Sequence, residues 1–158
     1  LPAYDSNQRI IDLMKITSQK LKFDIFINYK IHPINNEKKL QITKNFKECV
    51  EISKALNQSE LIITGMSSLA LEAIALGKYV INIQNPDSFN LTTIPNNVSN
   101  IFWRNAYDSD DLVNILNEYY QNRFGDNKLR ESKKNEIIKR YFNFSNLKET
   151  QRIFSNEW

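Results

Sequence analysis

Cysteine, histidine, glycine and proline are all scarce in this chain of 158 residues, which contains one cysteine, one histidine, three glycines and four prolines. With Cys49 as its single cysteine, the chain can form no internal disulfide bond, and a reducing compartment is expected. We interpret Cys49 as a small buried apolar residue. One cysteine and one histidine leave no ligand spacing typical of a zinc site, so no metal is expected.

Long hydrophobic runs are also missing. The apolar runs are far shorter than the ~20 residues that span a bilayer, and the start at Leu1 lacks the basic and apolar regions of a signal peptide. The net charge of +3 is mild and does not favour a nucleic-acid partner. We therefore expect a cytoplasmic protein. Because the chain does not begin with methionine, we expect it to be cut from something longer or to lack its start.

Two common phosphate-binding patterns and one catalytic pattern are absent. The sequence has neither a Gly-x-Gly-x-x-Gly fingerprint nor a Walker-type loop. The segment from Gly65 to Leu69 (GMSSL) lacks the closing glycine of the Gly-x-Ser-x-Gly nucleophile elbow. A dinucleotide-binding enzyme, a P-loop enzyme and an α/β-hydrolase are therefore not indicated.

The clearest pattern runs from Leu61 to Ile83. An apolar run, Leu61 to Thr64, precedes a turn of small residues; a helix-forming segment closed by Gly77 and a second apolar run follow. This order predicts a strand, a turn, a helix and a second strand. A helical crossover makes the two strands parallel, with both faces buried. Free N–H groups and two hydroxyls at the helix N-terminus then form an anion site in physical terms.

The chain before this unit predicts one helix and one strand. Asp5 is expected to cap a helix that extends to Lys20, and Leu1-Pro2 to be the tail of a strand whose beginning is absent. The segment from Phe23 to Tyr29 is rich in aromatic and β-branched residues and predicts a buried strand. One apolar stripe supports the helix and consists of Ile10, Leu13, Met14 and Leu21.

The remaining segments predict shorter elements. In order, we expect a mostly irregular segment over 34–47, a strand over Cys49–Ile52, a helix from Ser53 to Asn57, a turn over 85–87, a polar loop over 88–99 and a strand over Asn100–Trp103. Asp108 or Ser109 is expected to cap the next helix, which Gly125-Asp126 ends. A basic helix to Arg140 and a final helix from Ser145 to Phe154 would follow.

Strands alternate with helices from Phe23 to Tyr120. This alternation predicts an α/β fold, with a Rossmann-like parallel sheet that has helices on both faces and further helices at the C-terminus. No internal repeat or low-complexity linker divides the chain. Residues 1–158 are therefore predicted to form a single domain.

Five side chains near the ends of predicted strands could carry chemistry. His32 follows a strand and lies beside Lys30, where open parallel sheets bind ligands, so its imidazole could donate to a phosphate; the alternative is a histidine that anchors a loop. Ser67 and Ser68 are typical helix caps, but only one of them can cap, which leaves a hydroxyl for an anion. Glu72, one turn into the helix, could accept a hydrogen bond from a ribose hydroxyl.

The basic segment from Asp126 to Arg140 has two interpretations. Its positive side chains are Lys128, Arg130, Lys133, Lys134, Lys139 and Arg140, and its negative ones are Asp126, Glu131 and Glu136. A solvated helix face is the simpler interpretation. The alternative is a peripheral contact with an anionic membrane surface, at the inner face of the membrane.

Two short motifs resemble a known family. His32-Pro33 is followed roughly thirty residues later by LIITGMSS (61–68), by Leu71-Glu72-Ala73 and by the run from Gly77 to Ile81. Together they resemble the carboxyl-terminal half of GT-B-fold transferases of bacterial surface polysaccharides. Closest in pattern are capsule Kdo transferases, bacterial sialyltransferases and polysialyltransferases, and CDP-glycerol glycerophosphotransferases. The resemblance spans about Phe23 to Phe154.

The resemblance implies a donor-binding domain of a glycosyltransferase that uses a CMP- or CDP-activated sugar or polyol. In such a domain His32, Ser67 and Ser68 would hold the donor phosphate, with Lys30 and the turn at Gly65 beside them. Glu72 would lie near the ribose. The acceptor, a glycan or a lipid-linked molecule, would bind the missing amino-terminal half, so this half alone is expected to be inactive.

Departures from the family pattern define the alternatives. Epimerases of the same fold usually have Ser-Gly-Gly where this chain has Ser67-Ser68-Leu69, and glycerophosphotransferases tend to have Asp-Tyr where it has Gly65-Met66. The Glu-x7-Glu pair of another large GT-B group is absent around Glu72. The alternatives are a UDP-sugar 2-epimerase-like enzyme and a non-catalytic α/β module in which the serines only cap a helix.

Overall fold

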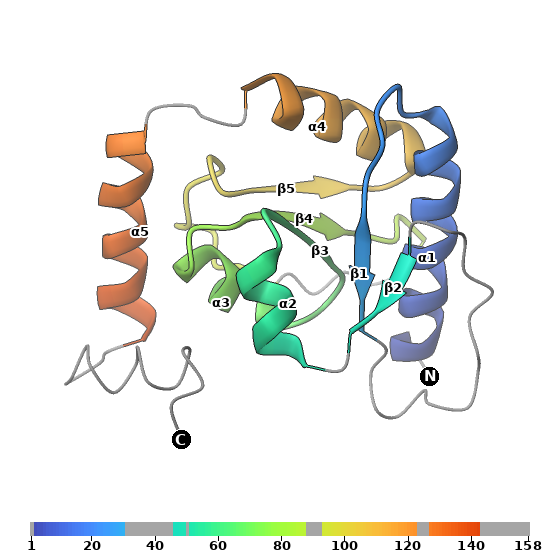
Figure 1. The fold of residues 1–158 in the computed structure, drawn as a ribbon. Helices are drawn as coiled ribbons and strands as arrows, with labels where there is room; N and C mark the ends of the chain where they lie inside the picture. Colours follow the sequence, from blue (N-terminus) through green and yellow to red (C-terminus); the bar gives the residue numbers. More distant parts are fainter. Residues whose placement is uncertain (1, 31–45, 50, 88–92, 123–126, 143–158) are drawn as a thin grey trace.

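A computed structural model describes residues 2–30, 46–49, 51–87, 93–122 and 127–142 of the chain (Figure 1). The elements in chain order are α1 (Pro2–Lys20), β1 (Ile27–Tyr29), β2 (Phe46–Glu48), α2 (Ile52–Gln58), β3 (Leu61–Thr64), α3 (Leu69–Ala75), β4 (Tyr79–Ile83), β5 (Trp103–Ala106), α4 (Ser109–Asn122) and α5 (Asn127–Tyr141). Strands and helices alternate from β2 to β4, and β5 and α4 follow, so the predicted α/β class is confirmed.

The described strands form two parallel sheets. One sheet has the order β3-β4-β5, and the other consists of β1 and β2. Figure 1 shows β1 and β2 beside the ends of the longer strands. The alternation along the chain predicts a single sheet that includes the Phe23–Tyr29 segment, but β1 pairs with β2 and not with β3.

The β3–α3–β4 unit matches its prediction closely. β3 and β4 run parallel, with Leu61 opposite Tyr79 and Thr64 opposite Asn82. Gly77 ends the crossover at φ 79°, in the left-handed region that a side chain with a Cβ rarely adopts. Its N–H donates to the carbonyl of Ile74 at 2.8 Å, which satisfies one of the last carbonyls of α3.

Helices cover both faces of the three-stranded sheet, as predicted. Val80 of β4 belongs to a fully buried cluster with Ala73 and Ile74 of α3 and Ile137 of α5. Ile81, the next residue, faces the opposite cluster, which contains Met14 of α1 and Leu112 and Leu116 of α4. Alternate residues of one strand therefore join two cores, each buried side chain contributing about 1.5–3 kcal/mol.

The start of α1 differs from its prediction. The helix begins at Pro2, so Pro2 is not part of a strand, and Asp5 lies inside the helix instead of capping it. Proline is well suited to the first helical position, because the N–H it lacks would have no partner there and its φ is already helical. Leu1 lies outside the described residues.

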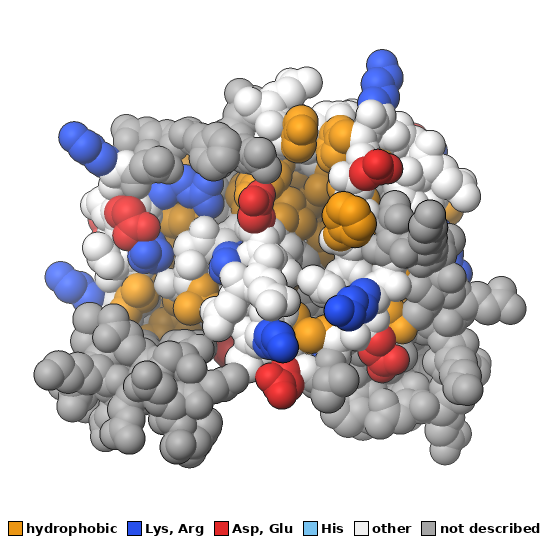
Figure 2. All heavy atoms as spheres, in the orientation of Figure 1, with side chains coloured by type: hydrophobic (Ala, Val, Ile, Leu, Met, Phe, Trp, Pro, Cys, Tyr) orange, Lys and Arg blue, Asp and Glu red, His pale blue; other side chains and the backbone are white. Residues whose placement is uncertain are grey.

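The predicted buried strand at Phe23–Tyr29 is shorter and half exposed. Only Ile27–Tyr29 pairs as a strand, and Phe26 is 87% exposed. Phe23 stacks on Tyr120 of α4, with ring centroids 4.5 Å apart. Figure 2 shows hydrophobic side chains between α4 and β1, where one side of β1 packs against the core. One face of this segment contacts the core, which produces alternating burial.

Three further boundaries shift. The second strand is Phe46–Glu48 and not Cys49–Ile52, so Phe46 and Lys47 do not belong to the predicted loop over 34–47. Ile52 begins α2, and the N-cap is the extended Glu51 in place of Ser53. The last strand starts at Trp103, where the prediction over Asn100–Trp103 ends, because a turn with Phe102 N–H bonded to Ser99 O precedes it.

The C-terminal helices agree with their predictions where they are described. Asp108 caps α4, since its Oδ1 accepts hydrogen bonds from the N–H groups of Asp110 and Asp111, both at 2.9 Å. The basic helix is α5. Gly125-Asp126 and the final helix predicted from Ser145 lie outside the described residues. Among the helices described, none combines the length and hydropathy of a membrane span.

Candidate functional site

The carboxyl ends of three parallel strands define one edge of the larger sheet. Thr64 of β3, Asn82 of β4 and Asn105 of β5 lie opposite one another in register at this edge. Open parallel sheets bind ligands outside the carboxyl ends of their strands. The turn from Gly65 to Ser68 follows β3 directly and leads into α3, so it lies at this edge.

The two serines of the turn have different roles. The Ser67 hydroxyl accepts the N–H of Leu69 at 3.3 Å, and the Ser67 N–H donates to Gly65 O at 2.9 Å. Ser68 is the N-cap residue of α3, yet its backbone is helical (φ −59°, ψ −23°) and its side chain makes no capping hydrogen bond. Ser67 therefore stabilises the turn, while the hydroxyl of the exposed Ser68 does not cap the helix.

A second segment is tied to this turn. The Thr93 hydroxyl donates to the carbonyl oxygen of Ser67 at 2.6 Å, and the same carbonyl accepts the N–H of Ala70 at 3.2 Å. Thr93 is the first residue of the described range 93–122, and the neighbouring Ile94 is fully buried in the core beneath α3. The Ser67 backbone is thus fixed from two directions.

Glu72 lies on the same side of α3 as Ser68. The two residues are four positions apart, which places them on one helix face. Glu72 is half-buried and lies in the first turn of this seven-residue helix. A carboxylate is favourable at a helix N-terminus, so the position of Glu72 also stabilises α3.

The other two candidates, Lys30 and His32, follow β1 in the sequence. Lys30 is exposed and directly follows β1, which belongs to the two-stranded sheet. The larger sheet therefore does not align Lys30 with the turn at Gly65, Ser67 and Ser68. His32 lies outside the described residues, and its proximity to the serines stays a prediction.

Two buried carboxamides at the same edge are not anticipated from the sequence. Asn82 and Gln84 are 1% and 4% exposed. Asn82 Nδ2 donates to Asn105 Oδ1 at 3.1 Å, whereas Asn82 Oδ1 and Gln84 Nε2 have no hydrogen-bond partner in the described part of the chain. Their signal in the sequence is the alternation Ile81-Asn82-Ile83-Gln84, which is unusual in a central strand with both faces covered.

The environment of Cys49 differs from its prediction. Cys49 is half-buried, which differs from the expected full burial, and its thiol donates to Glu51 O at 3.1 Å. Within the described ranges, histidine, cysteine, aspartate and glutamate form no cluster of three that could hold a metal ion.

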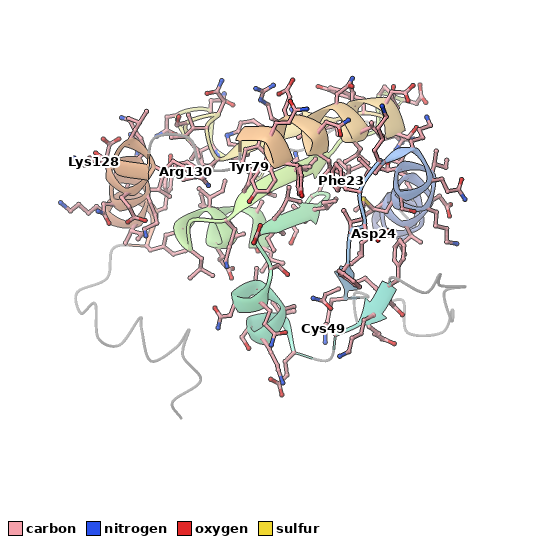
Figure 3. The ribbon with its side chains drawn as sticks, turned by 45° about the horizontal axis from the view of Figure 1, so that its top comes forward. Phe23, Asp24, Cys49, Tyr79, Lys128 and Arg130 are labelled. Carbon is pink, nitrogen blue, oxygen red and sulfur yellow. The ribbon has the colours of Figure 1, made fainter. Side chains whose placement is uncertain are left out.

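Several of the basic side chains of α5 form ion pairs or hydrogen bonds within the chain. Lys133 pairs with Glu136 at 3.0 Å, and Lys134 with Glu131 at 2.7 Å. Figure 3 shows Arg130 directed from α5 toward the sheet, where its guanidinium donates to Gly77 O at 3.3 Å; Lys128 lies on the outer side of the helix. Arg130 therefore helps to dock α5 onto the crossover.

One tyrosine with a perturbed pKa lies at the opposite end of β4. Burial raises the pKa of Tyr79 above its ordinary value of 10.0, and the charge of Arg104 acts in the opposite direction. Its ring packs against Tyr119 of α4 with centroids 5.1 Å apart. Tyr79 begins β4, so it does not belong to the edge that carries Ser68.

Comparison of the chain with models of protein families, with curated proteins and with solved structures finds no match. An assignment of function therefore depends only on the residues of this chain and on their arrangement.

Proposed function

We propose that the chain is the donor-binding domain of a glycosyltransferase of cell-surface polysaccharide synthesis, which uses a CMP- or CDP-activated sugar or polyol. The observation that carries this proposal is the Ser68 hydroxyl. It lies at the carboxyl edge of a parallel sheet, it is exposed, and it does not cap α3. The interpretation in which both serines only cap a helix does not account for this hydroxyl.

Each candidate residue has a role in this site. The Ser68 hydroxyl donates to the donor phosphate, while Ser67 holds the turn in place through Leu69. Glu72, one turn further along the same face, accepts a hydrogen bond from a ribose hydroxyl. A hydrogen bond to a charged group contributes about 1.5–3 kcal/mol.

Lys30 supplies positive charge and His32 supplies a hydrogen-bond donor from the segment after β1. In the transferase reaction, negative charge develops on the departing nucleotide phosphate, and fixed donors and cations stabilise it. The acceptor and the catalytic base belong to the other half of the protein, and α5 provides a peripheral contact with the inner face of the membrane.

A thermal-shift experiment with CMP, CDP, UMP and UDP tests the proposal. Saturation at ~100 times the dissociation constant stabilises the fold by about 2.7 kcal/mol, so the melting temperature should rise with CMP or CDP. Ser68→Ala should weaken this effect without a change in the melting temperature of the free chain.

Ser132→Ala is the matched control, because Ser132 is an exposed serine on α5. Equal nucleotide affinity of the Ser68→Ala variant and the wild type would overturn the assigned role of Ser68. No shift with any of the four nucleotides would overturn the proposed function.

A further inference from the structure

Two buried carboxamides at the end of β4 have hydrogen-bonding capacity that the described fold does not use. Asn82 Oδ1 and Gln84 Nε2 lack a partner in the residues that the structure describes, although both side chains are at least nine-tenths buried. Alternate residues of a strand share one face, so the two side chains emerge about 7 Å apart on the same side. A buried donor or acceptor without a partner destabilises a fold, so two such groups on one face of a strand are candidates for contact with a bound molecule.

Their place in the fold connects them to the Ser68 turn. Asn82 is the register partner of Thr64, the residue before Gly65. The same face of β4 carries Val80, which packs beneath α3. The turn leads from β3 to α3, so it passes over this face next to the carboxamides.

The free atoms define a hydrogen-bonding pattern. Asn82 offers an acceptor, because its Nδ2 is already engaged with Asn105 Oδ1 at 3.1 Å and this bond fixes the orientation of the amide. Gln84 offers a donor, Nε2. A complementary ligand group presents a donor beside an acceptor. The edge of cytosine does so, with its 4-amino group and N3, whereas uracil has a carbonyl oxygen and an N–H at these positions.

We propose that Asn82 and Gln84 bind the base of the donor nucleotide and select cytosine over uracil, an inference that rests on the proposed function. The cytosine amino group donates to Asn82 Oδ1, and cytosine N3 accepts from Gln84 Nε2. Both atoms are covered in the free chain, so the side chains around them must move for the base to reach them.

Calorimetric titration of the 158-residue chain with CMP and UMP tests this selection. We expect CMP to bind at least about tenfold more tightly than UMP, since uracil loses both hydrogen bonds. Binding of both nucleotides with equal affinity would overturn base selection and leave the proposed function standing. Binding of neither nucleotide, and of neither CDP nor UDP in the same titration, would overturn the proposed function, and base recognition with it.

Gln84→Met provides the second test, because methionine keeps the length of the side chain and removes the amide. CMP affinity should fall about tenfold while UMP affinity stays the same. The melting temperature of the ligand-free variant should rise, because the unpaired donor is gone. Gln58→Met, an exposed glutamine on α2, is the control. An unchanged ratio of CMP to UMP affinity in Gln84→Met would overturn the proposal, as would a lower melting temperature of the free variant.

Discussion

On the side of β4 that faces α1 and α4, Ile81 and Ile83 are both buried among apolar side chains. On the opposite side Val80 is apolar, but Asn82 and Gln84 follow it toward the carboxyl end of the strand. The first face is apolar along the whole strand, whereas the second changes from apolar to polar at the edge where parallel sheets bind ligands. The face toward α1 and α4 therefore contributes to stability along the whole strand. The opposite face contributes to stability through Val80 and carries the polar residues of the candidate site at its carboxyl end.

The helices on the two faces begin differently as well. α4 has a capped N-terminus, where Asp108 accepts two backbone hydrogen bonds. α3 begins at Leu69, and the side chain of its N-cap residue Ser68 makes no capping bond, whereas the Ser67 hydroxyl accepts the N–H of Leu69. The helix whose N-cap side chain makes no capping bond is therefore the one at the candidate site. The comparison shows that the Asp108 side chain stabilises the start of α4, while the Ser68 side chain makes no such bond at the start of α3.

The largest effect is expected from truncation on the apolar face. Ile81→Ala removes a fully buried side chain and should lower the free energy of unfolding by about 2–5 kcal/mol, measured by urea denaturation. Ile16→Ala, at a residue of α1 that is 44% exposed, is the control and should cost much less. Similar losses for both variants would contradict the assignment of Ile81 to the core.

The next effect is expected in binding. His32→Ala should weaken CMP or CDP binding by about 1.5–3 kcal/mol in a calorimetric titration, because a hydrogen bond to the donor phosphate is lost. The melting temperature of the free variant should stay the same. Unchanged affinity would assign His32 to the loop-anchoring role.

Capping distinguishes the two helices directly. Asp108→Ala should lower the free energy of unfolding by about 1 kcal/mol, because two N–H groups at the start of α4 lose their acceptor. Ser68→Ala should leave it unchanged, since Ser68 makes no capping bond. A loss for Ser68→Ala equal to that for Asp108→Ala would show that Ser68 is a cap after all.

The smallest effect concerns alkaline pH. The pKa of Tyr79 is raised in the folded chain, so the folded state holds this proton more tightly than the unfolded state does. The corresponding stability is fully present below the ordinary pKa of 10.0 and is lost as pH rises through the folded pKa. Tyr79→Phe should therefore lose less stability than the wild type above about pH 10 in thermal melts. Parallel pH profiles would contradict the burial effect.

The β3–α3–β4 unit could be predicted from the sequence because its signals are local. A β-branched run, small residues, a helix-forming segment and Gly77 each specify their own structure. The Phe23–Tyr29 segment has equally strong strand residues, but its neighbours decide its burial. Packing of Phe23 on Tyr120, far away in the sequence, leaves Phe26 exposed, and no local pattern contains that information.

The candidate site also has features that could be predicted from the sequence and features that depend on the fold. The position of Ser67 and Ser68 at a strand end follows from the sequence, but the choice of which serine bonds to the helix depends on backbone angles. The role of Asn82 was missed because its partner Asn105 lies on another strand. The prediction that His32 joins Ser68 depends on residues outside the described ranges and stays a prediction.

The arrangement of the strands determines how fast each backbone amide exchanges its hydrogen with deuterated solvent. β4 has a hydrogen-bonded neighbour on each side and helices above and below, so its amides should exchange only when the whole domain opens. β1 and β2 have three residues each and pair only with one another among the described strands, and such two-stranded ribbons are marginal in water. Their amides should exchange first, long before the rest of the molecule responds.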